Sequence, residues 1–237
     1  MSKEQNPKQE HAGQKGPPKD GARKGPPQGK KPGGAPKKHD AAEVDSGPRT
    51  PPRMMLQYND QVRKAFAEKF GISNRMAQPR LQKIVLNVSM GRHLEGTKLP
   101  PHVKAAVLDT LERVTGQKPV VIKAKKSVSN FKVRAGYESA AMVTIRRDRM
   151  WHFLDRLINL ATPRIKDFRG LSDKAFDRQG NYAMGLTEQG VFPEINMAEA
   201  QFTHGMNINF CFGNSNAERS KFVLEQLGMP FVKPDQK

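Results

Sequence analysis

Hydrophobic and polar residues alternate along four segments of the chain, and this period of two predicts β-strands with one buried face. The four segments are 81–90, 140–147, 182–186 and 206–212. In the first of them, Ile84 and Leu86 lie on the face opposite Asn87. A shorter apolar segment, residues 119–123, is also predicted to be a strand.

Four other segments place apolar residues three or four positions apart, which predicts amphipathic helices. These segments are 56–70, 101–116, 149–162 and 215–228. Gly71 and Gly116 are placed to cap two of the helices at their C-terminal ends, and Pro163 ends the third. In the last segment, Ser215 and Glu218 have the spacing of an N-terminal capping box.

The order of these elements predicts the fold class. Strands and helices are interspersed, but without the regular β-α-β-α order of a doubly wound parallel fold. We therefore predict an α+β fold, in which helices pack on one face of a largely antiparallel sheet and the other face is open for RNA. The polar residues expected on the open face are Asn87, Ser89, Thr144, Arg146, Asn207 and Asn209.

Residues 1–53 differ in composition from the rest of the chain. They contain ten of the 18 prolines and eight of the 20 glycines, but no Phe, Tyr, Trp, Leu or Ile. Such a segment cannot form a hydrophobic core. We predict a disordered basic extension at 1–53, rich in Pro, Gly and Lys, followed by one folded domain at 54–237.

The charge of the chain points to a polyanionic partner. The formal net charge is +18, and the part after residue 53 still carries +12. RNA, DNA and anionic membranes could neutralise this excess. A membrane is the weakest candidate, because the sequence has no run of 18 apolar residues and no apolar N-terminal stretch. The single cysteine, Cys211, cannot build a disulfide framework or a cysteine-based zinc site.

Sequence patterns of known catalytic sites are absent. The chain has no Walker lysine loop, no Gly-x-Ser-x-Gly motif and no His-Glu-x-x-His motif. The histidines after residue 53 have no partners at metal-ligand spacing, and we interpret them as solvated or locally hydrogen-bonded. They are His93, His102, His152 and His204. We therefore expect no catalytic residue, no metal and no cofactor.

The strongest positive signal is the basic segment 114–136, which contains six Lys or Arg residues and no acidic residue. Its central part lies between two predicted strands, so it should project as a long loop. The loop would present cations, hydroxyls, an amide and the ring of Phe131 to phosphates and bases. The alternative is a solvated loop whose lysines only aid solubility, but ordinary surfaces mix the two signs of charge.

A second basic cluster lies within residues 146–178. Its members are Arg146, Arg147, Arg149, Arg156, Arg164, Lys166, Arg169, Lys174 and Arg178. Five aspartates interrupt this cluster, so we expect part of it to form ordinary surface ion pairs.

Ten short phrases, in order along residues 54–231, closely resemble bacterial large-subunit ribosomal protein five, a family that binds 5S ribosomal RNA. They include Pro79-Arg-Leu-Gln-Lys-Ile-Val-Leu-Asn, Lys123-Ala-Lys-Lys-Ser, Arg149-Met-Trp, Asp167-Phe-Arg-Gly and Leu227-Gly-Met-Pro-Phe. One phrase alone would be weak, but the ordered set is specific. The basic extension is atypical of the family.

The resemblance implies a non-enzymatic, structural protein of the large ribosomal subunit that is ribosome-bound in the cytoplasm and acts in translation. The implied partners are 5S rRNA, which the family anchors in the central protuberance, large-subunit rRNA and large-subunit protein eighteen. The resemblance also implies contact with P-site tRNA and an intersubunit bridge to small-subunit protein thirteen. No membrane partner is implied.

The resemblance and the strand pattern together suggest two groups of site residues. The candidates for 5S rRNA binding are Asn87, Ser89, Gln117, Lys118, Thr144 and Arg146. The resemblance assigns tRNA contact to the long loop, with Lys123, Lys125, Lys126, Ser127, Ser129, Asn130, Phe131, Lys132 and Arg134.

Two other functions remain as alternatives. A free RNA-binding regulator or chaperone could use the same domain, but it would be substoichiometric to ribosomes. An RNA-modifying enzyme would need a pocket in which an acid, a base or a metal converge, and the sequence indicates none.

Overall fold

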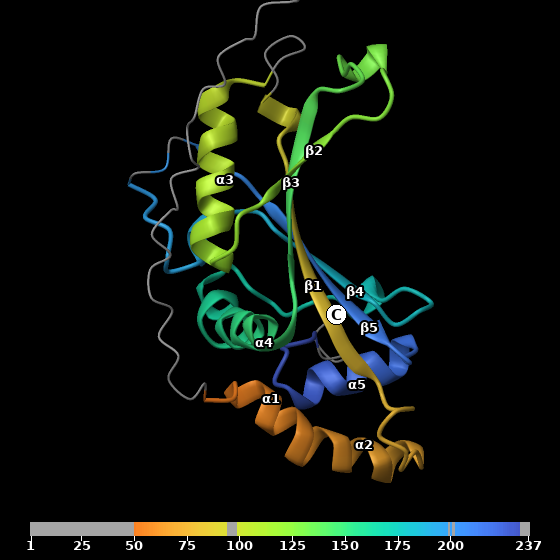
Figure 1. The fold of residues 1–237 in the computed structure, drawn as a ribbon. Helices are drawn as coiled ribbons and strands as arrows, with labels where there is room; N and C mark the ends of the chain where they lie inside the picture. The colour runs from red at the N-terminus through yellow and green to blue at the C-terminus, as the bar shows by residue number, and fades with distance from the viewer. Residues whose placement is uncertain (1–49, 94–98, 199, 201, 233–237) are drawn as a thin grey trace, which may run out of the picture. The chain divides into compact units, whose positions relative to one another are not determined.

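The computed structural model describes residues 50–93, 99–198, 200 and 202–232 (Figure 1). The predicted extension lies outside the described residues as far as residue 49, so its disorder stays a prediction.

Within the described residues, five strands form one sheet in the order β2-β3-β1-β5-β4, and every neighbouring pair is antiparallel. The strands are β1 (Arg80–Ser89), β2 (Val120–Lys123), β3 (Glu138–Ile145), β4 (Tyr182–Leu186) and β5 (Met206–Gly213). All five strand predictions are confirmed. The long strand β1 lies at the centre of the sheet, between β3 and β5.

The predicted helical segments are also confirmed in the described part of the chain. The helices are α1 (Arg53–Gln57), α2 (Arg63–Phe70), α3 (Pro101–Thr115), α4 (Arg147–Arg156) and α5 (Ala217–Gln226). A π-helical turn, Tyr58–Val62, joins α1 to α2, so the two form the single helical segment that the sequence predicts. Gly71 and Gly116 end α2 and α3 with φ angles of 68° and 64°, as glycine caps do.

The predicted capping box at the start of α5 is wrong. The N-cap residue is Asn216, one position later than predicted, and it makes no side-chain capping hydrogen bond. The Ser215 hydroxyl lies 2.7 Å from that of Ser220 and also donates to the Asn216 carbonyl. Because Asn216 is extended, with φ −123° and ψ 169°, Glu218 falls one position short of its capping place.

The junction between β3 and α4 is tighter than the sequence predicts. The predicted strand extends to Arg147, but β3 ends at Ile145 and α4 begins at Arg147. Arg147 has a φ angle of 55°, in the left-handed region that residues other than glycine rarely adopt. This conformation turns the chain from strand to helix without a loop.

The helices cover one face of the sheet. Figure 1 shows α3 and α4 on the same side of the strands. The strands bury alternate residues in a single core with the helices, and Ile84, Leu86 and Ile208 are fully or almost fully buried. Aromatic rings bring α2 and α5 into this core, where Phe66 and Phe222 lie 6.2 Å apart. The prediction of helices packed on one face is confirmed.

We predict that Leu86→Ala lowers the free energy of unfolding by about 2–5 kcal/mol, because Leu86 is fully buried at the centre of the sheet. Urea denaturation of the full chain measures this loss. The matched control is Val85→Ala, since Val85 is half-buried on the opposite face of the same strand. Equal losses for the two variants would contradict the assignment of the buried face.

Candidate nucleic-acid interface

The face of the sheet away from the helices is polar. Asn87 lies between Met142 of β3 and Asn207 of β5 in one row across the strands. In the next row, Thr144 and Asn209 flank Val85. We call these residues, with Ser89, the polar face. Its residues are half-buried or exposed, in contrast to the buried residues between them.

The polar face carries no acidic residue among the described strand positions that contribute to it. The glutamate nearest to it in sequence, Glu138, starts β3, and its carboxylate accepts a hydrogen bond from Lys104 of α3 at 2.7 Å. In the middle of the face, Asn87 Oδ1 is buried and has no hydrogen-bond partner within the described residues. The face therefore has a free acceptor and no negative charge to repel a phosphate.

The structure places the predicted 5S-binding residues along the β2-β3-β1 half of the sheet. Asn87, Ser89 and Thr144 lie on the strands themselves. Gln117 and Lys118 are exposed in the turn that leads into β2, where Val120 pairs with Met142. The sixth residue, Arg146, is the exposed N-cap residue of α4.

Two arginines of the second basic cluster hold the turn between α3 and β2. Arg149 donates to the Gly116 carbonyl at 3.3 Å, and Arg156 donates to the Val114 carbonyl at 2.9 Å. Arg156 also forms an ion pair with Glu194. The expectation that part of this cluster forms ordinary pairs is confirmed, because these guanidinium groups hold the fold together.

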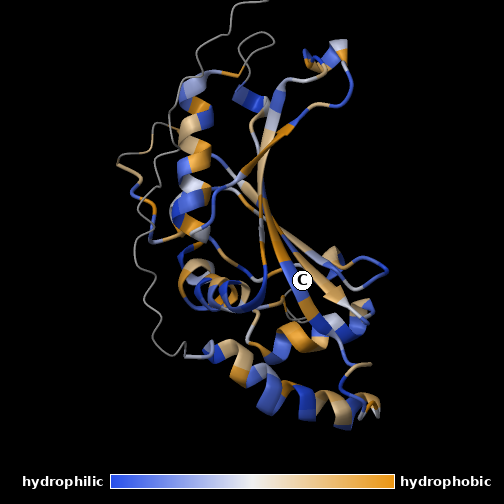
Figure 2. Cartoon of the chain, viewed as in Figure 1, coloured by the Kyte–Doolittle hydropathy of each residue, from blue (hydrophilic) through white to orange (hydrophobic). Residues whose placement is uncertain are grey.

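The segment between β2 and β3 is a long loop, as predicted, and it extends beyond the strands at the end of the sheet where β2 ends (Figure 1). Val128 and Val133 exchange two backbone hydrogen bonds, of 2.9 and 3.2 Å, which close its tip. The Ser127 hydroxyl accepts from the Ala135 amide at 2.9 Å. At the tip, the Phe131 ring is 74% exposed. Much of the loop is hydrophilic in Figure 2, and its basic side chains are exposed.

A cavity of about 360 Å³ lies where β1 begins and β3 ends. We call it the arginine cavity, because Arg63, Arg80, Arg146 and Arg147 line it, with no acidic residue in the lining. The sequence marked Arg146 and Arg147 as candidates and missed the other two. No sequence signal groups these four, because α2, β1 and the β3–α4 junction contribute them from separate parts of the chain.

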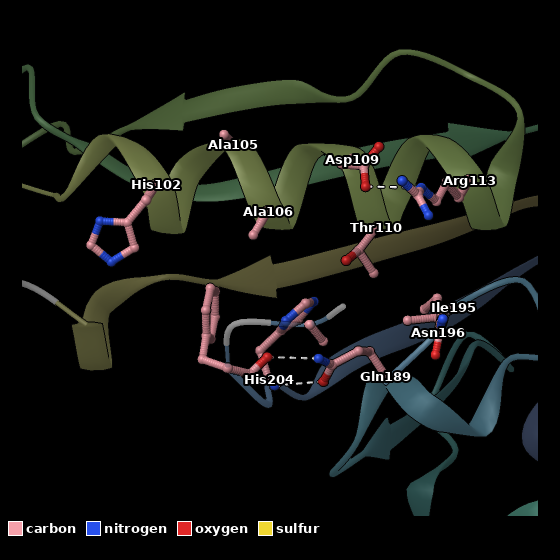
Figure 3. Close-up of a pocket in the computed structure, with 12 residues that line it drawn as sticks. His102, Ala105, Ala106, Asp109, Thr110, Arg113, Gln189, Ile195, Asn196 and His204 are labelled. Atoms are coloured by element: carbon pink, nitrogen blue, oxygen red, sulfur yellow. Dashed lines mark hydrogen bonds and ion pairs between the residues drawn. The ribbon is translucent and has the colours of Figure 1, made fainter. Parts of the chain in front are cut away.

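A second cavity, of about 460 Å³, lies between α3 and the segment from Gln189 to His204 (Figure 3). The prediction that the histidines are solvated or locally bonded is wrong for His204. Its side chain is buried, and neither ring nitrogen has a hydrogen-bond partner within the described residues. The Gln189 side chain holds this segment by accepting from the His204 amide and donating to the Phe202 carbonyl.

Burial lowers the pKa of His204 to about 4, and the nearby charge of His93 adds to this effect. Both imidazole rings pack against Phe202, with centroid distances of 4.8 Å for His93 and 5.4 Å for His204. His102 and His152 are exposed, as expected. The neutral form of His204 is therefore the one that the folded protein accommodates.

In the described part of the chain, no group of three His, Cys, Asp or Glu side chains could hold a metal ion. No helix found there has the length and apolar character needed to cross a membrane.

A polar sheet face without acidic side chains, next to an exposed basic loop, is typical of RNA-binding proteins. Comparison with known families is more specific. The model of ribosomal protein L5 matches residues 74–134, and the model of the C-terminus of the ribosomal L5 family matches residues 138–231. The chain belongs to the ribosomal L5 family.

Relatives support this assignment over almost their whole length. The large ribosomal subunit protein uL5 of Bdellovibrio bacteriovorus is 46% identical over 181 residues, which cover 76% of this chain and 99% of that protein. The protein of the same name from Natranaerobius thermophilus is 45% identical over 179 residues, covering 76% and 98%. Family membership confirms the predicted class, a structural and non-enzymatic, ribosome-bound protein of the large subunit that acts in translation.

We predict that the protein loses stability as the pH falls from about 6.5 to about 4. His204 has a lowered pKa when folded, so the unfolded chain binds its proton first. The contribution of His204 is complete above the unfolded pKa. It is lost toward the folded one, by up to about 3 kcal/mol at roughly 1.4 kcal/mol per pH unit.

Urea denaturation at pH 7 and at pH 5 measures this effect. His204→Gln should show a smaller difference between the two pH values than the native chain does. His152→Gln, which changes an exposed histidine, should keep the native difference. If His204→Gln also kept the full difference, the loss of stability would arise elsewhere.

Proposed function

We propose that the polar face binds 5S rRNA and anchors it in the central protuberance of the large subunit. The observation that carries this proposal is the combination of a helix-covered face and a polar, acid-free face on one sheet. Because the helices pack on the first face, the second is available to a partner. Its side chains can donate and accept hydrogen bonds without repelling a phosphate backbone.

The size and chemistry of the side chains support RNA as the ligand. Asn87, Ser89 and Thr144 are short, so the wide and shallow minor groove of an A-form helix can approach the strands. Amide and hydroxyl groups are suited to the 2′-hydroxyls and base edges that this groove presents. The unpartnered Oδ1 of Asn87 could accept one such hydrogen bond after a small rotation of the side chain. Lys118 and Arg146 lie at the margins, where phosphates would pass.

We also propose that the loop between β2 and β3 contacts the P-site tRNA. The Phe131 ring can stack on a base or a ribose, and the exposed lysines can pair with phosphates. The hydrogen bonds of Val128, Val133 and Ser127 support a defined loop shape, which lowers the entropy cost of binding.

The remaining partners follow from the family resemblance. We propose contacts with large-subunit rRNA, with large-subunit protein eighteen and with small-subunit protein thirteen, the last through an intersubunit bridge. The ordered sequence phrases and the identity to proteins named as large-subunit components support this assignment.

We predict that the face and the loop separate in their effects on binding. Asn87→Ala combined with Thr144→Val should weaken 5S rRNA binding by roughly tenfold, since each lost hydrogen bond costs about 0.5–1.5 kcal/mol. Lys125→Glu combined with Lys126→Glu should change 5S binding far less, but should reduce crosslinking of the loop to tRNA in assembled ribosomes.

Filter binding of the full chain to 5S rRNA measures the first effect, with an unrelated RNA of equal length as the reference. The native chain should prefer 5S rRNA. Equal losses of 5S affinity for the face and loop variants would refute the proposed division between the two surfaces. A native chain that bound both RNAs equally would refute the assignment of the 5S partner.

A further inference from the structure

We propose that the arginine cavity binds a backbone phosphate of the RNA that lies on the polar face. The proposal rests on the proposed function and extends it to a site that neither the strand pattern nor the basic loop indicates. The ligand is one phosphodiester of the RNA. Guanidinium groups recognise its oxygens by charge and by hydrogen bonds, without reference to the base sequence.

The charges of the cavity are unusual for this protein because none of them is neutralised. Within the described residues, Arg63, Arg80, Arg146 and Arg147 form no ion pair and no hydrogen bond to another side chain or carbonyl. Arginines nearby in the fold are paired: Arg53 with Asp155 at 2.6 Å, and Arg149 and Arg156 with backbone carbonyls. Four unpaired cations around one hollow repel one another, and a bound anion would remove that repulsion.

The walls of the cavity are preorganised by aromatic packing. The rings of Tyr58 and Trp151 are almost fully buried and lie 5.3 Å apart. The Arg63 guanidinium lies 5.0 Å from the centre of the Tyr58 ring, and its Nε is buried without a hydrogen-bond partner. The Tyr58 hydroxyl donates to the Pro79 carbonyl, which fixes this wall to the start of β1. A phosphate would therefore meet donors whose positions are already restricted.

The backbone at Arg147 supports a role for its side chain. A φ angle of 55° costs a residue with a Cβ atom roughly 1 kcal/mol, whereas glycine would adopt it freely. The chain nevertheless has arginine at this position, and the side chain lines the cavity. Strained residues of this kind concentrate at functional sites, where the side chain rather than the backbone is used.

The position of the cavity favours RNA over a free anion. Arg146 follows Thr144 on the same side of β3, and Arg80 is the first residue of β1, so the cavity adjoins the polar face. The basic loop lies beyond the opposite end of the sheet (Figure 1). The ten residues of β1 span roughly 33 Å at about 3.3 Å per residue, so cations flank an RNA on this face at both ends.

The test uses the full chain with Arg80→Gln and Arg147→Gly together. Glycine relieves the strain at position 147, so this change should not unfold the protein, and Arg147→Gly alone provides a second, milder variant. The matched control, Lys64→Gln with Arg75→Gln, removes two exposed positive charges that line neither cavity. Thermal melting followed by circular dichroism verifies that each variant is folded.

Binding to 5S rRNA and to the unrelated RNA is measured from low to physiological salt. The cavity variant should lose at least tenfold in affinity at physiological salt, and its log–log salt slope should become shallower by about 0.7–0.9, the loss of one phosphate contact. The control should keep the native slope. Because a phosphate contact is independent of sequence, the shallower slope should appear with both RNAs, even if the preference for 5S rRNA fails. Equal slopes for cavity variant and control would overturn the proposal.

Trp151 is the single tryptophan of the chain, so its fluorescence reports directly on the cavity. RNA should change the Trp151 emission of the native and control proteins, but much less that of the cavity variant. Inorganic phosphate, titrated at constant ionic strength, separates the two sources of the anion. A response to inorganic phosphate without a response to RNA would identify a free-anion site and overturn the assignment to RNA.

Discussion

Burial of one face of the sheet is the constraint on which the rest of the structure depends. All five strands are antiparallel neighbours, so their alternate side chains combine into two continuous surfaces. The described helices pack their apolar sides into the core beneath one of these surfaces. A one-residue slip of β1 would bury Asn87 and expose Leu86, so the hydrophobic effect holds both the register and the composition of the free face.

The same constraint separates two uses of arginine. Where α4 packs against the end of α3, Arg149 and Arg156 donate to backbone carbonyls and support the turn before β2. At the end of the free face, other arginines surround a hollow without a carboxylate. Cations that lie near one another in sequence thus stabilise the fold in one case and stay available for an anion in the other, because only the former have acceptors within reach.

The candidate site was predictable where its residues are local in sequence. The basic loop is one continuous segment without acidic residues, and the alternation along β1 and β3 indicates which side chains share the free face. The arginine cavity and the buried His204 were not predictable, because their surroundings come from distant segments. The capping box failed for a subtler reason, since one extended residue, Asn216, shifts the helix start by a single position.

The sequence by itself determined the number and type of the main elements, the α+β class, the position of the basic loop and the family resemblance. These properties depend on periodicity, local composition and ordered motifs, which are written along the chain. Only the tertiary structure decided the strand order, the left-handed turn at Arg147, the burial of His204 and the meeting of four arginines at one cavity. Each of these depends on contacts between residues far apart in sequence, where packing and desolvation override the local pattern.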